Sequence, residues 1–168
     1  QHEDPFTALV SAIVNQQLSS KAAATIYRRV LALLPGGGPP TPVAILAVPE
    51  PELRSAGLSR AKAAYIRDLA ARVCANDVHL DALAILDDEA VVAELTKVKG
   101  IGRWSAEMFL MFRLGRPDVL PELDLGVQNA IQRAYGLKKR PTPKDVLRIG
   151  ERWRPYASIA SWYLWRSL

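Results

Sequence analysis

The sequence predicts an all-α protein, and two observations support this prediction. Prolines and glycines divide the 168 residues into segments of helix length, in which apolar residues recur at spacings of three and four. No segment shows the sustained apolar–polar alternation of a half-buried strand. The length suits one domain with a real core, which we expect to form two lobes rather than two independent domains.

Capping residues mark where several of the predicted helices begin. Asp4 precedes Pro5, a typical N-cap followed by proline at the first helical position, and Ser59 follows the helix stop at Gly57. The expected helices cover approximately residues 5–14, 20–34, 41–47, 50–56, 60–75, 87–95, 103–114, 125–134, 143–153 and 156–167. Because a helical pattern starts almost at the first residue, we expect that upstream residues are absent from this chain.

The charge balance suits a polyanionic partner. The net charge is +5 and the sequence pI is about 9.6, which fits DNA but is weak evidence without a DNA-contacting motif. Hydrophobic residues make up 49% and charged residues 23%, as in ordinary globular proteins. No apolar run approaches the roughly 18 residues of a membrane span, and no signal peptide opens the chain. We therefore expect a cytoplasmic protein, associated with the nucleoid if it is bacterial, with no membrane partner.

Cysteine and histidine give no pattern for a metal site. Cys74 is the single cysteine and lies in an apolar helical segment, where we expect a small buried side chain. One thiol excludes an internal disulfide and a four-cysteine zinc or iron–sulfur site. His2 and His79 do not have ligand spacing. The sequence therefore predicts no metal held by side chains.

The most specific local feature is a turn between two predicted helices, Val98-Lys-Gly-Ile-Gly102. Gly100 and Gly102 permit backbone conformations closed to other residues and allow a phosphate to approach main-chain N–H groups. Val98 and Ile101 are expected to turn inward. Positive charge flanks the turn at Lys97, Lys99 and Arg103. A plain glycine-rich connection is the alternative, but the pattern favours binding of the DNA backbone without recognition of base sequence.

A carboxylate follows this turn at the start of another predicted helix. Asp124 directly precedes that helix, and we expect Leu125, Val127 and Ile131 to pack inward. As an N-cap, Asp124 would be held at a helix end that favours negative charge. Two interpretations stay open on these residues alone. Asp124 is either only a cap, or a fixed carboxylate that stabilises a sugar cation or orients an attacking water.

Together these motifs resemble a known family. The hairpin Val98–Gly102 and the segment Asp124-Leu-Gly126 are similar to those of the helix–hairpin–helix (HhH-GPD) base-excision DNA glycosylases, and within them to the 3-methyladenine DNA glycosylase II, or AlkA-like, branch. The resemblance spans essentially the whole chain, because segments 11–19, 57–62 and 151–156 also match.

The resemblance implies a fold and an activity. It implies a single domain over residues 1–168, with the hairpin at 96–106, lobes that are mixed in sequence, an active-site cleft between the lobes and no amino-terminal β domain. The implied activity is that of a monofunctional enzyme, a monomer that binds double-stranded DNA with damaged bases. It would flip out alkylated purines of the 3-methyladenine and 7-methylguanine type and hydrolyse their N-glycosidic bonds.

The resemblance also assigns roles to individual residues. Asp124 matches the catalytic aspartate. Trp104 stands where lyase-type relatives have a nucleophilic lysine, so a Schiff base and strand cleavage are not expected. Trp104 and Trp165 match the aromatic base pocket, where Met108 replaces an aromatic stacking partner. Gln17 matches the residue that intercalates into the duplex. Core packing is the alternative for both tryptophans, and an ordinary polar helix end is the alternative for Gln17.

The resemblance also bears on cofactors, and two competing functions stay open. The iron–sulfur cysteines of other branches are missing, and we expect no cofactor. In the family, hairpin carbonyls often hold a monovalent cation, which here would use those of Lys97, Val98 and Gly100. One competing function is a glycosylase for oxidised or deaminated bases, and another is an HhH DNA-binding module without catalysis.

Overall fold

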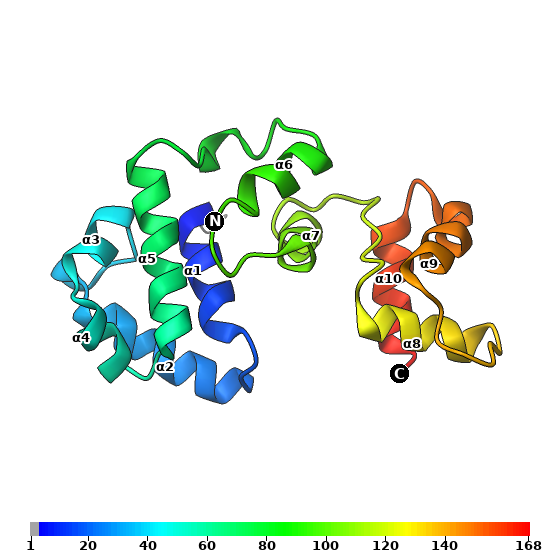
Figure 1. Ribbon diagram of the computed structural model, residues 1–168, viewed down its shortest axis with the longest axis horizontal. Helices are drawn as coiled ribbons and strands as arrows, with labels where there is room; N and C mark the ends of the chain where they lie inside the picture. Colours follow the sequence, from blue (N-terminus) through cyan, green and yellow to red (C-terminus); the bar gives the residue numbers. More distant parts are fainter. Residues whose placement is uncertain (1–3) are drawn as a thin grey trace. The chain divides into compact units, whose positions relative to one another are not determined.

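A computed structural model of the protein describes residues 4–168, which form two compact units. The first unit ends at Gly102 and the second is Arg103–Leu168 (Figure 1). All regular elements in residues 4–168 are helices, which confirms the all-α prediction. The single domain with lobes mixed in sequence stays a prediction. His2 lies outside the described residues.

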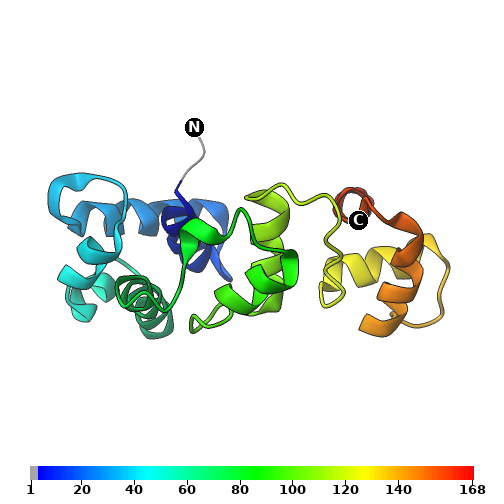
Figure 2. The same ribbon diagram turned by 90° about the horizontal axis from the view of Figure 1, so that it is seen from above.

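Six α-helices form the described part of the first unit: α1 (Pro5–Asn15), α2 (Ser20–Leu33), α3 (Pro42–Ala47), α4 (Glu50–Ser55), α5 (Arg60–Cys74) and α6 (Asp88–Leu95), with 3₁₀ turns η1 (Pro35–Gly37) and η2 (Leu80–Ala82). The predicted caps are confirmed, because the side chains of Asp4 and Ser59 accept main-chain N–H groups at the starts of α1 and α5. Helix α1 is apolar along most of its length and packs against α2 and α5 (Figure 2).

Four α-helices form the second unit: α7 (Arg103–Phe112), α8 (Leu125–Ala134), α9 (Pro143–Gly150) and α10 (Ala157–Arg166), with the 3₁₀ turn η3 (Glu151–Trp153). Helices α8 and α10 pack against each other. Their core contains Val127 and Ile131 from α8, both fully buried, and Val146 from α9. The helix predicted over residues 143–153 is in fact α9 followed by η3.

Two burial predictions are wrong. Leu125 is 57% exposed, because it is the first residue of α8 and about 200° around the helix from the buried Val127. Cys74 is exposed, because it is the last residue of α5 and lies beyond the last buried position, Ala70. In residues 4–168, no helix has the length and apolar character needed to cross a membrane.

Candidate active site and DNA-contact elements

The side chain of Asp124 lies at the N-terminus of α8, where three N–H groups hold both of its carboxylate oxygens. The main-chain N–H of Val127 donates to Oδ1 at 2.7 Å, which makes Asp124 the N-cap. The indole Nε1 of Trp165 donates to the same oxygen at 2.8 Å. The indole Nε1 of Trp104 donates to Oδ2 at 2.7 Å. The predicted cap is therefore confirmed, and the carboxylate also has a fixed orientation, as electrostatic catalysis requires.

Gly126 allows Trp165 to reach this carboxylate. A Cβ atom at Gly126 would lie 2.9 Å from Cδ1 of Trp165 and 3.0 Å from Oδ1 of Asp124. Any larger residue would therefore push the indole or the carboxylate out of place. The glycine of the Asp-Leu-Gly segment thus has a local packing reason that the sequence did not show.

The chain before Asp124 is anchored to the start of α10. The hydroxyl of buried Ser158 accepts the N–H of Val119 at 2.9 Å and donates to the carbonyl of Arg116 at 2.7 Å. Asp118 accepts the N–H of Ala157 at 3.1 Å and pairs with Arg154 at 3.0 Å. These bonds connect the segment that leads to Asp124 with the helix that carries Trp165.

One face of α7 presents three large side chains at spacings of four residues. Trp104 is 45% exposed, Met108 is half-buried and Phe112 is 59% exposed. Phe112 also stacks on Trp165, with ring centroids 6.0 Å apart and planes 30° apart. The structure thus brings predicted residues Trp104 and Trp165 to Asp124, with Met108 one helical turn after Trp104. Phe112 was missed, although its spacing of eight residues from Trp104 was a usable signal.

Trp165 has features of both a core residue and a site residue, the two interpretations that the sequence left open. Its ring packs against the core of α8, α9 and α10, as a structural tryptophan would. Its N–H nevertheless points to Asp124 rather than to a main-chain carbonyl. Trp104 is too exposed for a core residue.

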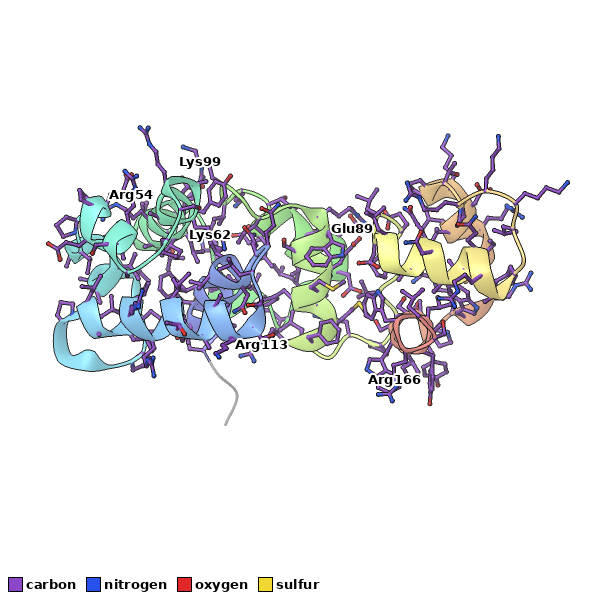
Figure 3. All side chains as sticks on the ribbon, turned by 90° about the horizontal axis from the view of Figure 1, so that it is seen from below. Arg54, Lys62, Glu89, Lys99, Arg113 and Arg166 are labelled. Carbon is purple, nitrogen blue, oxygen red and sulfur yellow. The ribbon has the colours of Figure 1, made fainter. Side chains whose placement is uncertain are left out.

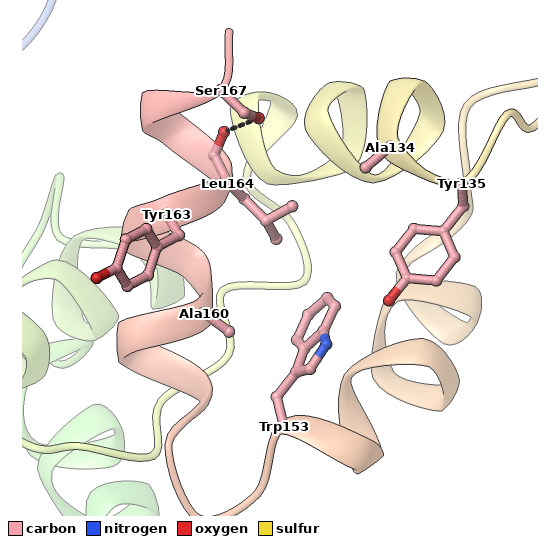
Figure 4. A pocket seen from close by; sticks show the side chains of 7 residues that line it. All are labelled: Ala134, Tyr135, Trp153, Ala160, Tyr163, Leu164 and Ser167. Atoms are coloured by element: carbon pink, nitrogen blue, oxygen red, sulfur yellow. Dashed lines mark hydrogen bonds between the residues drawn. The ribbon is translucent and has the colours of Figure 1, made fainter.

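A pocket of about 300 Å³ lies in the second unit, and neither Asp124 nor the three side chains on α7 line it. Its lining includes Tyr135, Trp153 and Tyr163, from the end of α8, η3 and α10 (Figure 4). None of the predicted site residues, all of which the structure describes, contributes to that lining.

The hairpin has the expected core but only one conformationally demanding glycine. Val98 and Ile101 are buried, as predicted. Gly100 has φ +82°, and an added Cβ would collide with the ring of Tyr65 at 2.1 Å. Gly102 does not have positive φ, and its Cβ would meet no heavy atom of the described chain within 4 Å. Gly100 thus uses the conformational freedom of glycine, whereas Gly102 does not, and the open surroundings of Gly102 leave room for a phosphate.

The three cations near the hairpin are not equally free to contact a phosphate. Lys99 is the most exposed, with 71% of its side chain accessible and its Nζ 3.9 Å from Asp68 (Figure 3). Lys97 donates from Nζ to the carbonyl of Asp77 at 3.0 Å and pairs with Glu94 at 2.8 Å. Arg103 pairs with Glu107 at 3.0 Å. All three predicted cations thus have an acidic neighbour within 4 Å, but the pairs of Lys97 and Arg103 are much closer than that of Lys99.

Glu94 is the acidic group most strongly perturbed by these contacts. Burial alone would raise its pKa, but hydrogen bonds from Lys97 and from the main chain and ring of His79 outweigh burial and lower the pKa to about 2. The ion pair at the end of α6 thus stays charged over the neutral range. No group of three or more His, Cys, Asp or Glu residues suited to a metal is found in residues 4–168.

Gln17 lies in the short loop between α1 and α2. It is exposed and has φ +55°, an uncommon conformation for a residue with a side chain. The adjacent Leu18 is 39% exposed. Leu18 was missed by the sequence analysis, although a large apolar residue in a polar loop is a recognisable signal. The loop thus presents two adjacent exposed side chains, and intercalation by Gln17 stays a prediction.

Comparisons with known proteins give the family. Residues 10–155 match the model of the HhH-GPD superfamily base excision DNA repair proteins. The chain is 34% identical over 168 residues to DNA-3-methyladenine glycosylase 1 of Schizosaccharomyces pombe, covering 99% of this chain and 74% of that protein.

Two solved structures agree with this match. A DNA-3-methyladenine glycosidase from Bacillus halodurans superimposes with a TM-score of 0.87 at 41% identity, over 98% of this chain and 76% of that one. The 3-methyladenine DNA glycosylase Mag1 of Schizosaccharomyces pombe, in complex with abasic DNA, gives 0.78 at 34% identity, over 98% and 80%. This chain therefore belongs to the HhH-GPD superfamily of base excision DNA repair proteins.

Proposed function

We propose that this chain is a DNA glycosylase that hydrolyses the N-glycosidic bond of alkylated purines of the 3-methyladenine and 7-methylguanine type. The observation that carries the proposal is the carboxylate of Asp124, held by the indole N–H groups of Trp104 and Trp165. The names of the relatives support the substrate class, since they are 3-methyladenine glycosylases. The enzyme would act as a monomer on duplex DNA in the cytoplasm or nucleoid.

The chemistry needs little beyond this carboxylate. An N3- or N7-alkylated purine is cationic, so the electron pair of the breaking C1′–N bond leaves with a base that becomes neutral. The sugar is left as an oxocarbenium-like cation, which the carboxylate of Asp124 stabilises. A water oxygen then bonds to C1′, and the water's proton passes to the carboxylate or to solvent.

Strand cleavage is not part of the proposed activity. A lyase forms a Schiff base through an amine nucleophile. The corresponding residue here, Trp104, has an indole N–H that is already donated to Asp124. The product would be an abasic site, in keeping with the abasic DNA bound to the related Mag1.

The first unit would supply the grip on DNA. The turn at Gly102 and the exposed Lys99 would bind phosphates without base recognition. Gln17 would enter the space left by the flipped base. Main-chain carbonyls of Lys97, Val98 and Gly100 are the proposed ligands of a monovalent cation. The carbonyls of Val98 and Gly100 already accept hydrogen bonds from Ile101 and Gln16, so the ion would use their second lone pairs.

The test is base release from methylated DNA by wild type and by an Asp124→Asn variant. Asparagine keeps the size of the side chain and an oxygen for the N-cap, so the variant should fold and bind DNA but release almost no base. A Glu122→Gln variant, two residues away and also acidic, is the matched control and should stay active. Full activity in Asp124→Asn would overturn the mechanism. Release of oxidised or deaminated bases but not alkylated ones would overturn the substrate class. DNA binding without any release by wild type would favour a binding module.

A further inference from the structure

Helix α5 contacts two elements that we propose bind DNA, the loop that carries Gln17 and the hairpin Val98–Gly102. It does so through one row of side chains. Lys62, Tyr65 and Asp68 are spaced three residues apart, so they lie along one face of the helix. Lys62 reaches the loop that carries Gln17, whereas Tyr65 and Asp68 reach the hairpin.

The contact with the loop is made at the end of α1. The Nζ of Lys62 donates to the carbonyl of Val14 at 2.8 Å and to that of Gln16 at 2.5 Å. These carbonyls lie at the negative end of α1, where a cation is favourable. The second bond holds the residue directly before Gln17.

The contact with the hairpin is made at its most constrained residue. The ring of Tyr65 fills the space where a side chain on Gly100 would be. The carboxylate of Asp68 accepts the main-chain N–H of Lys99 at 2.9 Å. Two consecutive hairpin residues are thus held against α5.

A direct bond joins the two elements to each other. The side-chain Nε2 of Gln16 donates to the carbonyl of Gly100 at 3.0 Å, across 84 residues of sequence. Gln16 therefore bonds to α5 through its carbonyl and to the hairpin through its amide group, while Gln17 beside it has an exposed side chain.

We propose that Gln16, supported by Lys62, is a positioning residue. It holds the loop that carries Gln17 at a fixed distance from the phosphate-binding turn at Gly100–Gly102. This inference rests on the proposed function. An intercalating side chain works only if it enters the duplex at a fixed distance from the phosphate that the hairpin holds. A loop without these bonds would have to become ordered at the moment of base flipping, and this loss of conformational entropy would make flipping less favourable. Gln16 contributes through Gln17, without contact with the damaged base.

The experiment measures single-turnover release of one alkylated purine from two DNAs, one with the lesion paired and one with the lesion bulged out. In the bulged DNA the base is already unpaired, so intercalation matters less. Gln16→Ala should slow release from the paired lesion by roughly 10- to 100-fold, since a misplacement of 1 Å can lower a rate by about 100-fold. Release from the bulged lesion should change much less. Lys62→Met, which keeps the aliphatic stem, should give the same selective loss.

A double variant separates positioning from general stability. If Gln16 acts through Gln17, the Gln16→Ala/Gln17→Ala double variant should be no slower on paired DNA than Gln17→Ala alone. Gln132→Ala, which removes a side-chain bond to a main-chain carbonyl in the second unit, is the matched control and should leave the paired-to-bulged ratio unchanged. All rates are compared well below the melting temperature of each variant.

Each result has one meaning. The positioning role would be overturned if Gln16→Ala lowered the rate of base release equally on paired and bulged DNA. It would also be overturned if the rate losses of the two single variants multiplied in the double variant. Neither result would affect the glycosylase function. No release by wild type from either DNA would instead overturn the proposed function. If Gln16→Ala does not fold, Lys62→Met alone decides through the same ratio.

Discussion

The indole N–H of Trp165 points at Oδ1 of Asp124 from 2.8 Å away, across 41 residues of sequence. The same oxygen accepts the N–H of Val127, so a helix cap and a tertiary contact meet on one atom. Asp124 is therefore both an N-cap and an oriented carboxylate, so its role as a cap does not exclude a catalytic role.

Replacing Trp165 with phenylalanine should separate these two contributions. Phe keeps an aromatic ring against the core but has no N–H, while the cap bond from Val127 remains. We expect kcat to fall roughly tenfold, the effect of losing about 1.4 kcal/mol of orientation in the transition state, with DNA affinity little changed. Trp162→Phe, at an exposed tryptophan of the same helix, is the control. Equal kcat values for Trp165→Phe and Trp162→Phe would show that the N–H of Trp165 does not orient the catalytic carboxylate.

Gly126→Ala should disrupt the site by steric collision. The added methyl would lie 2.9 Å from Trp165 and 3.0 Å from Asp124, so one of them must move. We expect the free energy of unfolding to fall by about 1–3 kcal/mol, which is usual for overpacking, together with loss of base release. Gly38→Ala is the matched control, because Gly38 has an extended backbone and open surroundings in the described chain. A fully active and stable Gly126→Ala enzyme would contradict the packing shown here.

The two lysines of the hairpin should differ in their effect on DNA binding. Lys99 is largely exposed, whereas Lys97 is engaged with Glu94 and Asp77. Lys99→Ala should reduce the slope of log K against log salt by about 1, the value for one phosphate contact, without altering base preference. Lys97→Ala should reduce the slope less. A changed base preference in Lys99→Ala would argue against a contact limited to the backbone.

Glu94 should make stability depend on pH in acid. Its pKa of about 2 in the folded state lies below the 4.5 of an unperturbed glutamate. The stabilisation is therefore complete above pH 4.5 and is lost as the pH falls toward 2. At pH 7, Glu94→Gln should lower the free energy of unfolding by about 1.5–3 kcal/mol, the scale of hydrogen bonds to a charged group. Urea unfolding at pH 7, 5, 4 and 3 should show the difference between the two proteins shrinking toward low pH. A constant difference would exclude the ion pair as its source.

Local signals explain what the sequence predicted well. The correct predictions depend on residues within one or two helical turns of each other. They include most helix bounds, the caps at Asp4 and Ser59, and the burial of Val98 and Ile101. The same reasoning placed Asp124 at a helix start. It was wrong for Leu125 and Cys74, because periodicity gives a face of a helix but not where the core ends.

By itself the sequence thus determined the all-α architecture, the hairpin and the position of the carboxylate along the chain. Only the tertiary structure decided which groups surround that carboxylate, which cations acidic neighbours hold, and that Gln16 bonds to Gly100. The physical reason is that these contacts join residues far apart in sequence. Their geometry depends on how helices pack, and no spacing within a single helix contains that information.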